Sequence, residues 1–211
     1  ASAEESTVLA QYVREERAPY GSYQSEAALE RALIRLLEEE GYAYLPIHDE
    51  AELIANLRTQ LSALNDYEFT DTEWERFFKT SIAPASEGIV EKTRRIQTDY
   101  IQNLKRDDGT TKNIRLIDKE HIHNNQYAVA GGADAGENAA AHTNRYDVTI
   151  LVNGLPLVHL ELKRRGVEIR QAFNQIRRYQ RDSFWAGAGL YEYVQIFVIS
   201  NGTNTKYYSN T

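Results

Sequence analysis

The chain has 211 residues, of which 42% are hydrophobic and 26% are charged, and these proportions argue against a disordered chain or a coiled coil. No apolar run approaches the ~20 residues that a membrane span needs, and the absence of cysteine excludes disulfides, thiol nucleophiles and Cys-ligated zinc. The formal net charge of −7 argues at first against a nucleic-acid partner.

The N-terminal segment is rich in Glu and Arg and has no apolar signal-peptide core, which favours a cytoplasmic location. We expect residues 1–24 to form an N-terminal arm and residues 25–211 to form one domain. The chain contains no methionine, not even at position 1, so we expect it to be a fragment of a longer protein.

Three helices are predicted in the N-terminal third of the chain. Ser25 is suited to cap a helix from Glu26 to Glu40, whose leucines recur at helical spacing, and Gly41 is suited to end that helix. A second amphipathic helix is expected from Glu50 to about Leu64. The sequence Thr70-Asp-Thr-Glu73 is a capping box, which predicts the start of a third helix.

The middle of the chain gives weaker signals. Asp107-Asp108-Gly109 predicts a turn, and strands are expected at Ile114–Asp118 and Gln126–Val129. The segment Gly131–Ala141 consists mostly of small residues and has low complexity, which is typical of a mobile loop.

The last third of the chain combines strands with one helix. A β-hairpin is predicted for residues 146–163, because Asn153-Gly154 separates two alternating segments. A helix is expected from Gly166 to about Arg181, and strands are expected at Tyr193–Ser200 and Lys206–Ser209. This order predicts an α/β fold in which a mixed β-sheet is flanked by helices and preceded by a helical N-terminal part.

The apolar side chains of the hairpin must face one core, and this requirement selects its register. These side chains are Val148, Ile150 and Val152 on the first strand and Val158, Leu160 and Leu162 on the second. A two-residue loop would place the two sets on opposite sides of the sheet. A three-residue loop with Gly154 in the left-handed region would pair residue 151 with 155 and residue 147 with 159, so we expect this loop.

The predicted register gathers Asp147, Glu161 and Lys163 on the face away from that core. Two carboxylates held close together repel each other, and a divalent cation removes the repulsion. Mg²⁺ prefers oxygen ligands, so we expect it to bind Asp147, Glu161 and the backbone carbonyl of Leu162. Lys163 would then hold a scissile phosphate or orient the attacking water. The hairpin therefore predicts metal-dependent phosphodiester hydrolysis.

A simpler interpretation is that Glu161 and Lys163 form a surface ion pair on a half-exposed sheet. The acid-x-Lys pattern alone does not separate the two interpretations. In roughly two of three sequences of this composition, at least one lysine has an acidic residue two positions before it by chance. Both interpretations therefore stay open at this point.

The expected helix after the hairpin adds further candidates. Gln175 and Tyr179 share one helix face and would reach the metal site or a nucleic-acid backbone; the alternative is a solvated Gln175 and a packing role for Tyr179. Residues 163–181 contain seven bases and one acid, which is compatible with a local anion-binding face or with a solvated cationic surface. The candidate phosphate contacts are Arg164, Arg165, Arg177, Arg178 and Arg181. Glu30 would reach the cluster if the first helix packs across the sheet.

Several of these residues together look like the PD-(D/E)xK nuclease core. They are Asp147, the turn Asn153-Gly-Leu-Pro-Leu157, Glu161-Leu-Lys163 and Gln175-x-x-x-Tyr179. Over roughly residues 25–211, the chain resembles the N-terminal endonuclease domain of the restriction (R) subunit of type I restriction–modification enzymes. The stretches that extend this resemblance are Gly88–Lys92, Asn113–Asp118, Asn124-Asn125 and Phe197–Gly202.

The resemblance implies a PD-(D/E)xK restriction-endonuclease-like fold and a Mg²⁺-dependent cleavage of double-stranded DNA, with Mn²⁺ as a substitute. It implies that Asp147 and Glu161 carry the metal ion and that Lys163 is catalytic. Gln175 and Tyr179 match a motif that supports the nuclease site or contacts DNA. We place at Glu30 the acidic helix residue that many relatives add to the metal site.

The resemblance also implies a larger assembly. The full subunit of this family continues into an ATP-driven, helicase-like translocase and works with modification (M) and specificity (S) subunits. One departure is Tyr146, which stands where many relatives have the proline that names the motif. Two alternatives remain: a nuclease-like module that binds DNA or partner subunits without catalysis, and a stand-alone repair or recombination nuclease.

Overall fold

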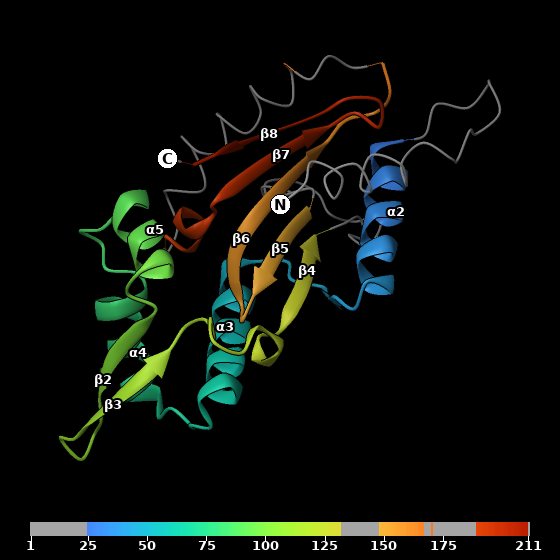
Figure 1. Cartoon of the computed structure of the whole chain (residues 1–211). Coiled ribbons are helices and arrows are strands. Elements are labelled where there is room, and N and C mark those ends of the chain that lie inside the picture. The colour runs from blue at the N-terminus through green and yellow to red at the C-terminus, as the bar shows by residue number, and fades with distance from the viewer. Residues whose placement is uncertain (1–24, 132–147, 167–169, 171–188, 211) are drawn as a thin grey trace.

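The computed structural model describes residues 25–131, 148–166, 170 and 189–210 (Figure 1). Within these residues, six strands form one sheet and two more form a separate antiparallel hairpin. In spatial order the sheet contains β1 (Ala43–Leu45), β4 (Tyr127–Gly131), β5 (Val148–Val152), β6 (Leu155–Leu162), β7 (Ile196–Ser200) and β8 (Thr205–Ser209). The pairs β1–β4 and β6–β7 are parallel and the other pairs are antiparallel. The predicted mixed α/β sheet is therefore confirmed.

The three predicted N-terminal helices are confirmed. They are α2 (Glu26–Glu39), α3 (Glu50–Asn65) and α4 (Asp71–Phe77), which continues as a π-helical turn, Phe78–Ile82. Ser25 caps α2, and Thr70 and Glu73 form the expected capping box of α4. These side chains pair with backbone N–H groups that have no partner inside the first turn, which is why the helices begin there. None of the described helices has the length and apolar character of a membrane span.

The middle of the chain contains elements that the sequence does not predict. These elements are β1, α5 (Ile89–Gln97), β2 (Ile101–Lys105) and two 3₁₀ turns, η3 (Ile122–Asn124) and η4 (Leu190–Tyr193). β3 (Thr111–Arg115) begins earlier than the predicted strand at Ile114, and it pairs with β2 around the predicted turn at residues 107–109. The strand predicted from Tyr193 begins only at Ile196, because η4 occupies its first residue. β4 and β8 lie close to where strands are predicted.

Several predicted features lie wholly or mostly outside the described residues. They are the arm at residues 1–24, the loop Gly131–Ala141 beyond Gly131, the first residues of the predicted hairpin, Tyr146 and Asp147, and the helix from Gly166 to Arg181, of which Gly166 and Arg170 are described.

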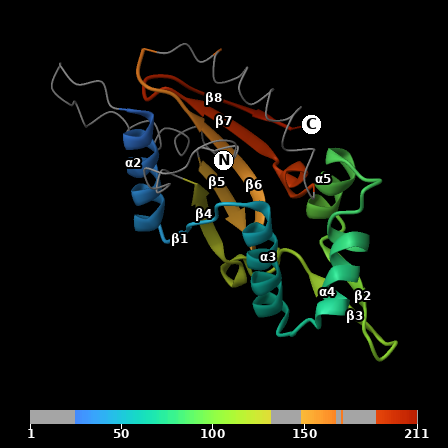
Figure 2. The same ribbon diagram turned by 180° about the vertical axis from the view of Figure 1, so that it is seen from behind.

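Hydrophobic clusters cover both faces of the sheet. Leu57 of α3 and Ala130 of β4 belong to the larger cluster, on the side that we call the α3 face. The neighbouring Val129 points to the opposite side and clusters with Val148 and with Ile34 of α2, so we call that side the α2 face. Figure 2 shows α3 in front of the central strands, α2 beside the β1 edge, and α4, α5 and the β2–β3 hairpin at the end of the molecule far from α2.

The hairpin turn differs from the prediction. Val152 pairs directly with Leu155, so Asn153 and Gly154 form a two-residue turn. Their φ angles of 50° and 83° are those of a type I′ turn, whose twist matches the flanking strands. The predicted three-residue loop, with residue 147 opposite residue 159, is therefore wrong, and Thr149 lies opposite His159 instead.

A β-bulge restores the orientation that the core requires. Leu151 pairs with Pro156 but Ile150 pairs with Val158, so Leu157 is an extra residue in β6. Beyond the bulge, the apolar residues of the two strands lie opposite each other and share one face, as predicted. The prediction places the extra residue in the loop, whereas the structure has it in strand β6, at Leu157.

A hydrogen-bond network holds the turn against the preceding segment. Asn153 is buried, and its Nδ2 donates to the Leu116 carbonyl at 3.0 Å and to Asn125 Oδ1 at 2.8 Å. Asn153 Oδ1 accepts from the Gln126 N–H, and Asn125 Oδ1 also accepts from the Asp118 N–H. The asparagine-containing stretches of the sequence therefore have a structural role, which is to fix the position of the β5–β6 turn.

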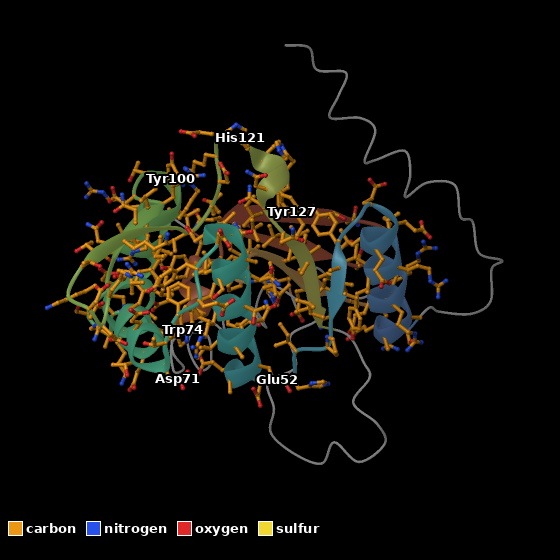
Figure 3. The ribbon with its side chains drawn as sticks, turned by 90° about the horizontal axis from the view of Figure 1, so that it is seen from below. Glu52, Asp71, Trp74, Tyr100, His121 and Tyr127 are labelled. Carbon is orange, nitrogen blue, oxygen red and sulfur yellow. The ribbon has the colours of Figure 1, made fainter. Side chains whose placement is uncertain are left out.

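Asp118 anchors the other end of this network. It is buried, and its Oδ1 lies 4.0 Å from Nδ1 of His121, which lies at the surface (Figure 3). Its carboxylate accepts hydrogen bonds from the Asn124 side chain and the His121 N–H, and these bonds lower its pKa to about 2. The ordinary pKa of 3.8 applies to the unfolded chain, so the ionised carboxylate stabilises the fold above about pH 4. This stabilisation is lost as the pH falls through about 2.

We therefore expect the free energy of unfolding to depend on the charge of Asp118. Wild type and Asp118→Asn should differ more at pH 6 than at pH 3, because at pH 3 the carboxyl group of the unfolded wild-type chain is mostly protonated while that of the folded chain is still mostly ionised. Urea unfolding of both chains at the two pH values measures this difference. An equal difference at pH 6 and pH 3 would contradict the expected contribution of the carboxylate.

Candidate metal and catalytic site

The polar side chains of β6 point to the α3 face of the sheet. His159 lies opposite Thr149, which lies opposite Ala130, so all three share that face. Glu161 follows His159 by two residues and has the same orientation. Both side chains are completely buried. The interpretation of Glu161 as part of a surface ion pair is therefore wrong.

Lys163 extends this polar row past the end of β6. Its N–H donates to the Ser200 carbonyl at 2.8 Å and so prolongs the pairing with β7. Its Nζ lies 2.7 Å from Oε1 of Glu161 and 3.5 Å from Oε2 of Glu26. The expected approach of Glu161 and Lys163 is thus confirmed, and the ammonium lies between two carboxylates.

The Glu161 carboxylate has the character of a metal ligand. Within the described part of the chain, neither of its oxygens accepts a hydrogen bond of standard geometry, although Lys163 lies close to Oε1. A buried carboxylate is costly unless its charge and its lone pairs are satisfied. Hard carboxylate oxygens are the ligands that Mg²⁺ and Mn²⁺ prefer. The residues present therefore fit a divalent cation.

His159 adds a second polar group beside Glu161. Its Nδ1 is 3.2 Å from Thr149 Oγ1, and its Nε2 is 3.9 Å from Glu161 Oε2. The ring also makes an edge contact with Phe197, with centroids 6.1 Å apart. These contacts hold the imidazole in place on the same face as Glu161.

Helix α2 reaches the site from the other side of the hairpin. Glu26, Glu30 and Ile34 are spaced by four residues and so share one face of this helix. Ile34 belongs to the cluster on the α2 face of the sheet, and Glu26 contacts Lys163. Glu30 lies between them and is only 2% exposed. The structure thus buries Glu30 on the helix face that approaches β6.

The structure adds Glu26, which the sequence does not single out, to the residues that contact Lys163. An acidic residue in the first turn of a helix is ordinary, because it interacts favourably with the helix N-terminus. Nothing in the local pattern distinguishes it from other glutamates of the N-terminal third. Its contact with Lys163 depends on how α2 is placed against β6, which only the tertiary structure shows.

The other predicted site residues are only partly described. Arg164 and Arg165 are exposed, and an Arg165 Nη2 lies 3.5 Å from the Gly202 carbonyl. Outside the described residues lie Asp147, Gln175, Tyr179, Arg177, Arg178 and Arg181. Among the described residues, no group of three or more His, Cys, Asp or Glu side chains has the arrangement of a metal site. Of the two hairpin carboxylates predicted to bind the metal ion, Glu161 lies within the described residues and Asp147 does not.

Comparison with known proteins gives consistent matches over most of the chain. Residues 23–211 match the family model described as "Type I restriction enzyme R protein N terminus". The EcoprrI endonuclease subunit of Escherichia coli is 51% identical over 191 residues, which are 90% of this chain and 60% of that protein. The SsaAORF53P endonuclease subunit of Staphylococcus saprophyticus is 40% identical over 193 residues, which are 89% of this chain and 20% of that protein.

A more distant relative matches a shorter part. The putative MjaIXP endonuclease subunit of Methanocaldococcus jannaschii is 33% identical over 106 residues, which are 48% of this chain and 10% of that protein. All three relatives are named as endonuclease subunits of type I restriction enzymes. The chain spans less than two thirds of the length of each.

Proposed function

Because this chain belongs to the family of type I restriction enzyme R protein N-terminal domains, we propose that it is the nuclease domain of a restriction endonuclease subunit. The proposed reaction is Mg²⁺-dependent hydrolysis of phosphodiester bonds in double-stranded DNA. The observation that carries the proposal is the buried Glu161 carboxylate, with Lys163 Nζ 2.7 Å away at the end of β6.

The proposed metal ligands are the carboxylates of Glu161 and Asp147 and the backbone carbonyl of Leu162. Asp147 directly precedes Val148, whose partner across the ladder is Leu160, the residue before Glu161. Glu30 is the further proposed ligand, supported by its burial on α2. When bound, Mg²⁺, or Mn²⁺ in its place, supplies Lewis acidity toward the phosphate and toward the attacking water.

The remaining residues are proposed to bind and orient the DNA. Lys163 carries a fixed positive charge at the point where negative charge develops on the scissile phosphate. Gln175 and Tyr179 are proposed to orient the nucleophile or the DNA backbone. The proposed contacts to other phosphates, which position the duplex without reading its sequence, are Arg164, Arg165, Arg177, Arg178 and Arg181.

The relatives are named as subunits of type I restriction enzymes, and this supports a proposed biological setting. We propose that the chain works within a type I restriction complex that also contains M and S subunits, with ATP consumed by a motor part outside this chain. A cytoplasmic location, where chromosomal and incoming DNA are found, is part of the same proposal. Residues 1–24 are proposed to form an arm and residues 25–211 the nuclease domain.

Replacement of Lys163 tests this function. In the enzyme that carries this chain, Lys163→Ala is expected to lower the rate of cleavage of circular duplex DNA in Mg²⁺ by about 10²–10³-fold, because a charge that stabilises the transition state is removed. Lys206→Ala, which removes an exposed lysine of β8, is the matched control and should cut normally. The assay follows conversion of closed circular DNA to linear DNA.

The outcomes separate the proposed function from its alternatives. Normal cleavage by Lys163→Ala would rule out its catalytic role. Wild-type enzyme that binds DNA but does not cut it in Mg²⁺ or Mn²⁺ would instead identify a binding module without catalysis. Efficient cutting by this chain without any motor part would favour a stand-alone nuclease.

A further inference from the structure

Lys163 lies between carboxylates from two distant parts of the chain. One belongs to Glu161, which is buried in β6, and the other belongs to Glu26, the first residue of α2. The lysine side chain is 10% exposed and that of Glu26 is 41% exposed. The ammonium is thus shielded from water on the Glu161 side, and the more exposed Glu26 lies between it and the solvent.

Both oxygens of Glu26 are engaged at this point. Oε2 lies 3.5 Å from Lys163 Nζ, and Oε1 accepts a hydrogen bond from the Arg164 N–H at 3.3 Å. The carboxylate therefore bridges the lysine side chain and the backbone of the next residue. Such a bridge restricts both the rotation of the carboxylate and the position of the lysine.

The helix that carries Glu26 is itself held in place. Ser25 caps its N-terminus through a hydrogen bond from the Ala28 N–H, and Ile34 is buried in the cluster on the α2 face of the sheet. Glu26 is therefore presented to Lys163 by a docked helix rather than by a loop. This arrangement is typical of groups that orient an active-site side chain.

The two carboxylates cannot play the same role once a cation is present. Glu161 is a proposed metal ligand, and a divalent ion at its oxygens would repel an ammonium 2.7 Å away. An anion that does not bind the metal ion then helps to keep Lys163 at the site. Glu26 is such an anion, since its two oxygens face the lysine and the Arg164 backbone.

We propose that Glu26 is a positioning residue that keeps the Lys163 ammonium at the active site when Glu161 coordinates the metal ion. This inference rests on the proposed nuclease function and adds a residue to it. Glu26 acts through Lys163, so its removal should affect the chemical step and leave the affinity for the metal ion nearly unchanged.

Three variants of α2, two with glutamine and one with aspartate, test the proposal. Glu26→Gln is expected to lower DNA cleavage by the enzyme by about 10–100-fold, as is usual for groups that orient an active-site residue. Glu39→Gln makes the same change at an exposed position of the same helix and should cut normally. Glu26→Asp keeps the charge and should recover most of the activity. Calorimetric titration of the chain with Mn²⁺ should give a dissociation constant for Glu26→Gln within about threefold of the wild-type value.

A spectroscopic measurement reports on the lysine itself. In the Ca²⁺-loaded chain labelled with ¹⁵N-lysine, the Lys163 ammonium signal should persist in wild type and in Glu39→Gln. It should broaden or disappear in Glu26→Gln, because the ammonium loses the Glu26 carboxylate and its protons exchange faster with water. This readout does not depend on DNA cleavage.

The opposite results would overturn the proposal. Normal cleavage by Glu26→Gln, or a Lys163 signal unaffected by this change, would show that Glu26 does not hold the lysine. A loss of Mn²⁺ affinity as large as that of Glu161→Gln would make Glu26 a metal ligand instead. Normal cleavage by Glu161→Gln would contradict the proposed nuclease site itself, and the inference about Glu26 would then lose its basis.

Discussion

Replacing Glu161 with Gln is expected to lower the rate of DNA cleavage by about 10³-fold or more, because a bound divalent cation contributes several kcal/mol to stabilising the reaction's transition state. The change keeps the shape of the side chain and removes its charge. The fold should survive, since the Lys163 ammonium, which loses the Glu161 charge 2.7 Å away, still has the Glu26 carboxylate at 3.5 Å. Cleavage of duplex DNA in Mg²⁺, together with thermal unfolding of the chain in EDTA, measures both effects.

Glu73 provides the matched control, because it is also buried but has well-defined structural partners. Burial raises the pKa of Glu73, but hydrogen bonds from the Asp107 N–H, the Tyr67 hydroxyl and the Thr70 N–H outweigh it, so the pKa lies below its ordinary value. Glu73→Gln should therefore lower the unfolding temperature and leave the cleavage rate of the folded enzyme unchanged. If Glu161→Gln instead behaves like Glu73→Gln, Glu161 is a structural acid.

The second large effect is expected at Gly154, in the turn that sets the hairpin. Its φ of 83° is unfavourable for other residues, and a Cβ atom built there would lie 2.6 Å from the Cα of Leu57 in α3. Gly154→Ala should therefore destabilise the chain by about 3–5 kcal/mol, from backbone strain and from the forced separation of the hairpin and α3. Urea unfolding measures the loss.

Gly109 separates the two contributions to this loss. It has a similar φ of 84°, but a Cβ atom there would meet nothing within 4 Å. Gly109→Ala should cost only about 1–2 kcal/mol, the strain of the left-handed backbone alone. Equal losses at the two glycines would show that the contact between the turn and α3 does not constrain the hairpin.

Local signals in the sequence predict much of the fold. Ser25 and the Thr70–Glu73 capping box locate helix starts because their side chains pair with backbone N–H groups a few residues away. The alternation of β5 and β6 predicts their pairing and the orientation of Glu161 for the same reason, since both depend on near neighbours. The approach of Glu161 and Lys163 follows from a spacing of two residues in one strand.

Features that depend on distant contacts could not be predicted. The bulge at Leu157 and a three-residue loop satisfy the same core requirement, and the choice between them depends on Asn153, whose partners Leu116 and Asn125 lie far away in the sequence. The contact of Glu26 with Lys163 likewise requires α2 to dock beside β6. Short or weakly periodic elements such as β1 and α5 gave no clear pattern of their own.

Diffraction from crystals of the chain soaked in Mn²⁺ tests the central claim most directly, because the anomalous signal locates the ion independently of any assay. We predict an anomalous peak within about 2.3 Å of a Glu161 carboxylate oxygen, with Lys163 turned toward Glu26. A structure that shows no peak at Glu161, with Lys163 still paired to its carboxylate at a saturating concentration of Mn²⁺, would contradict the metal-dependent nuclease site.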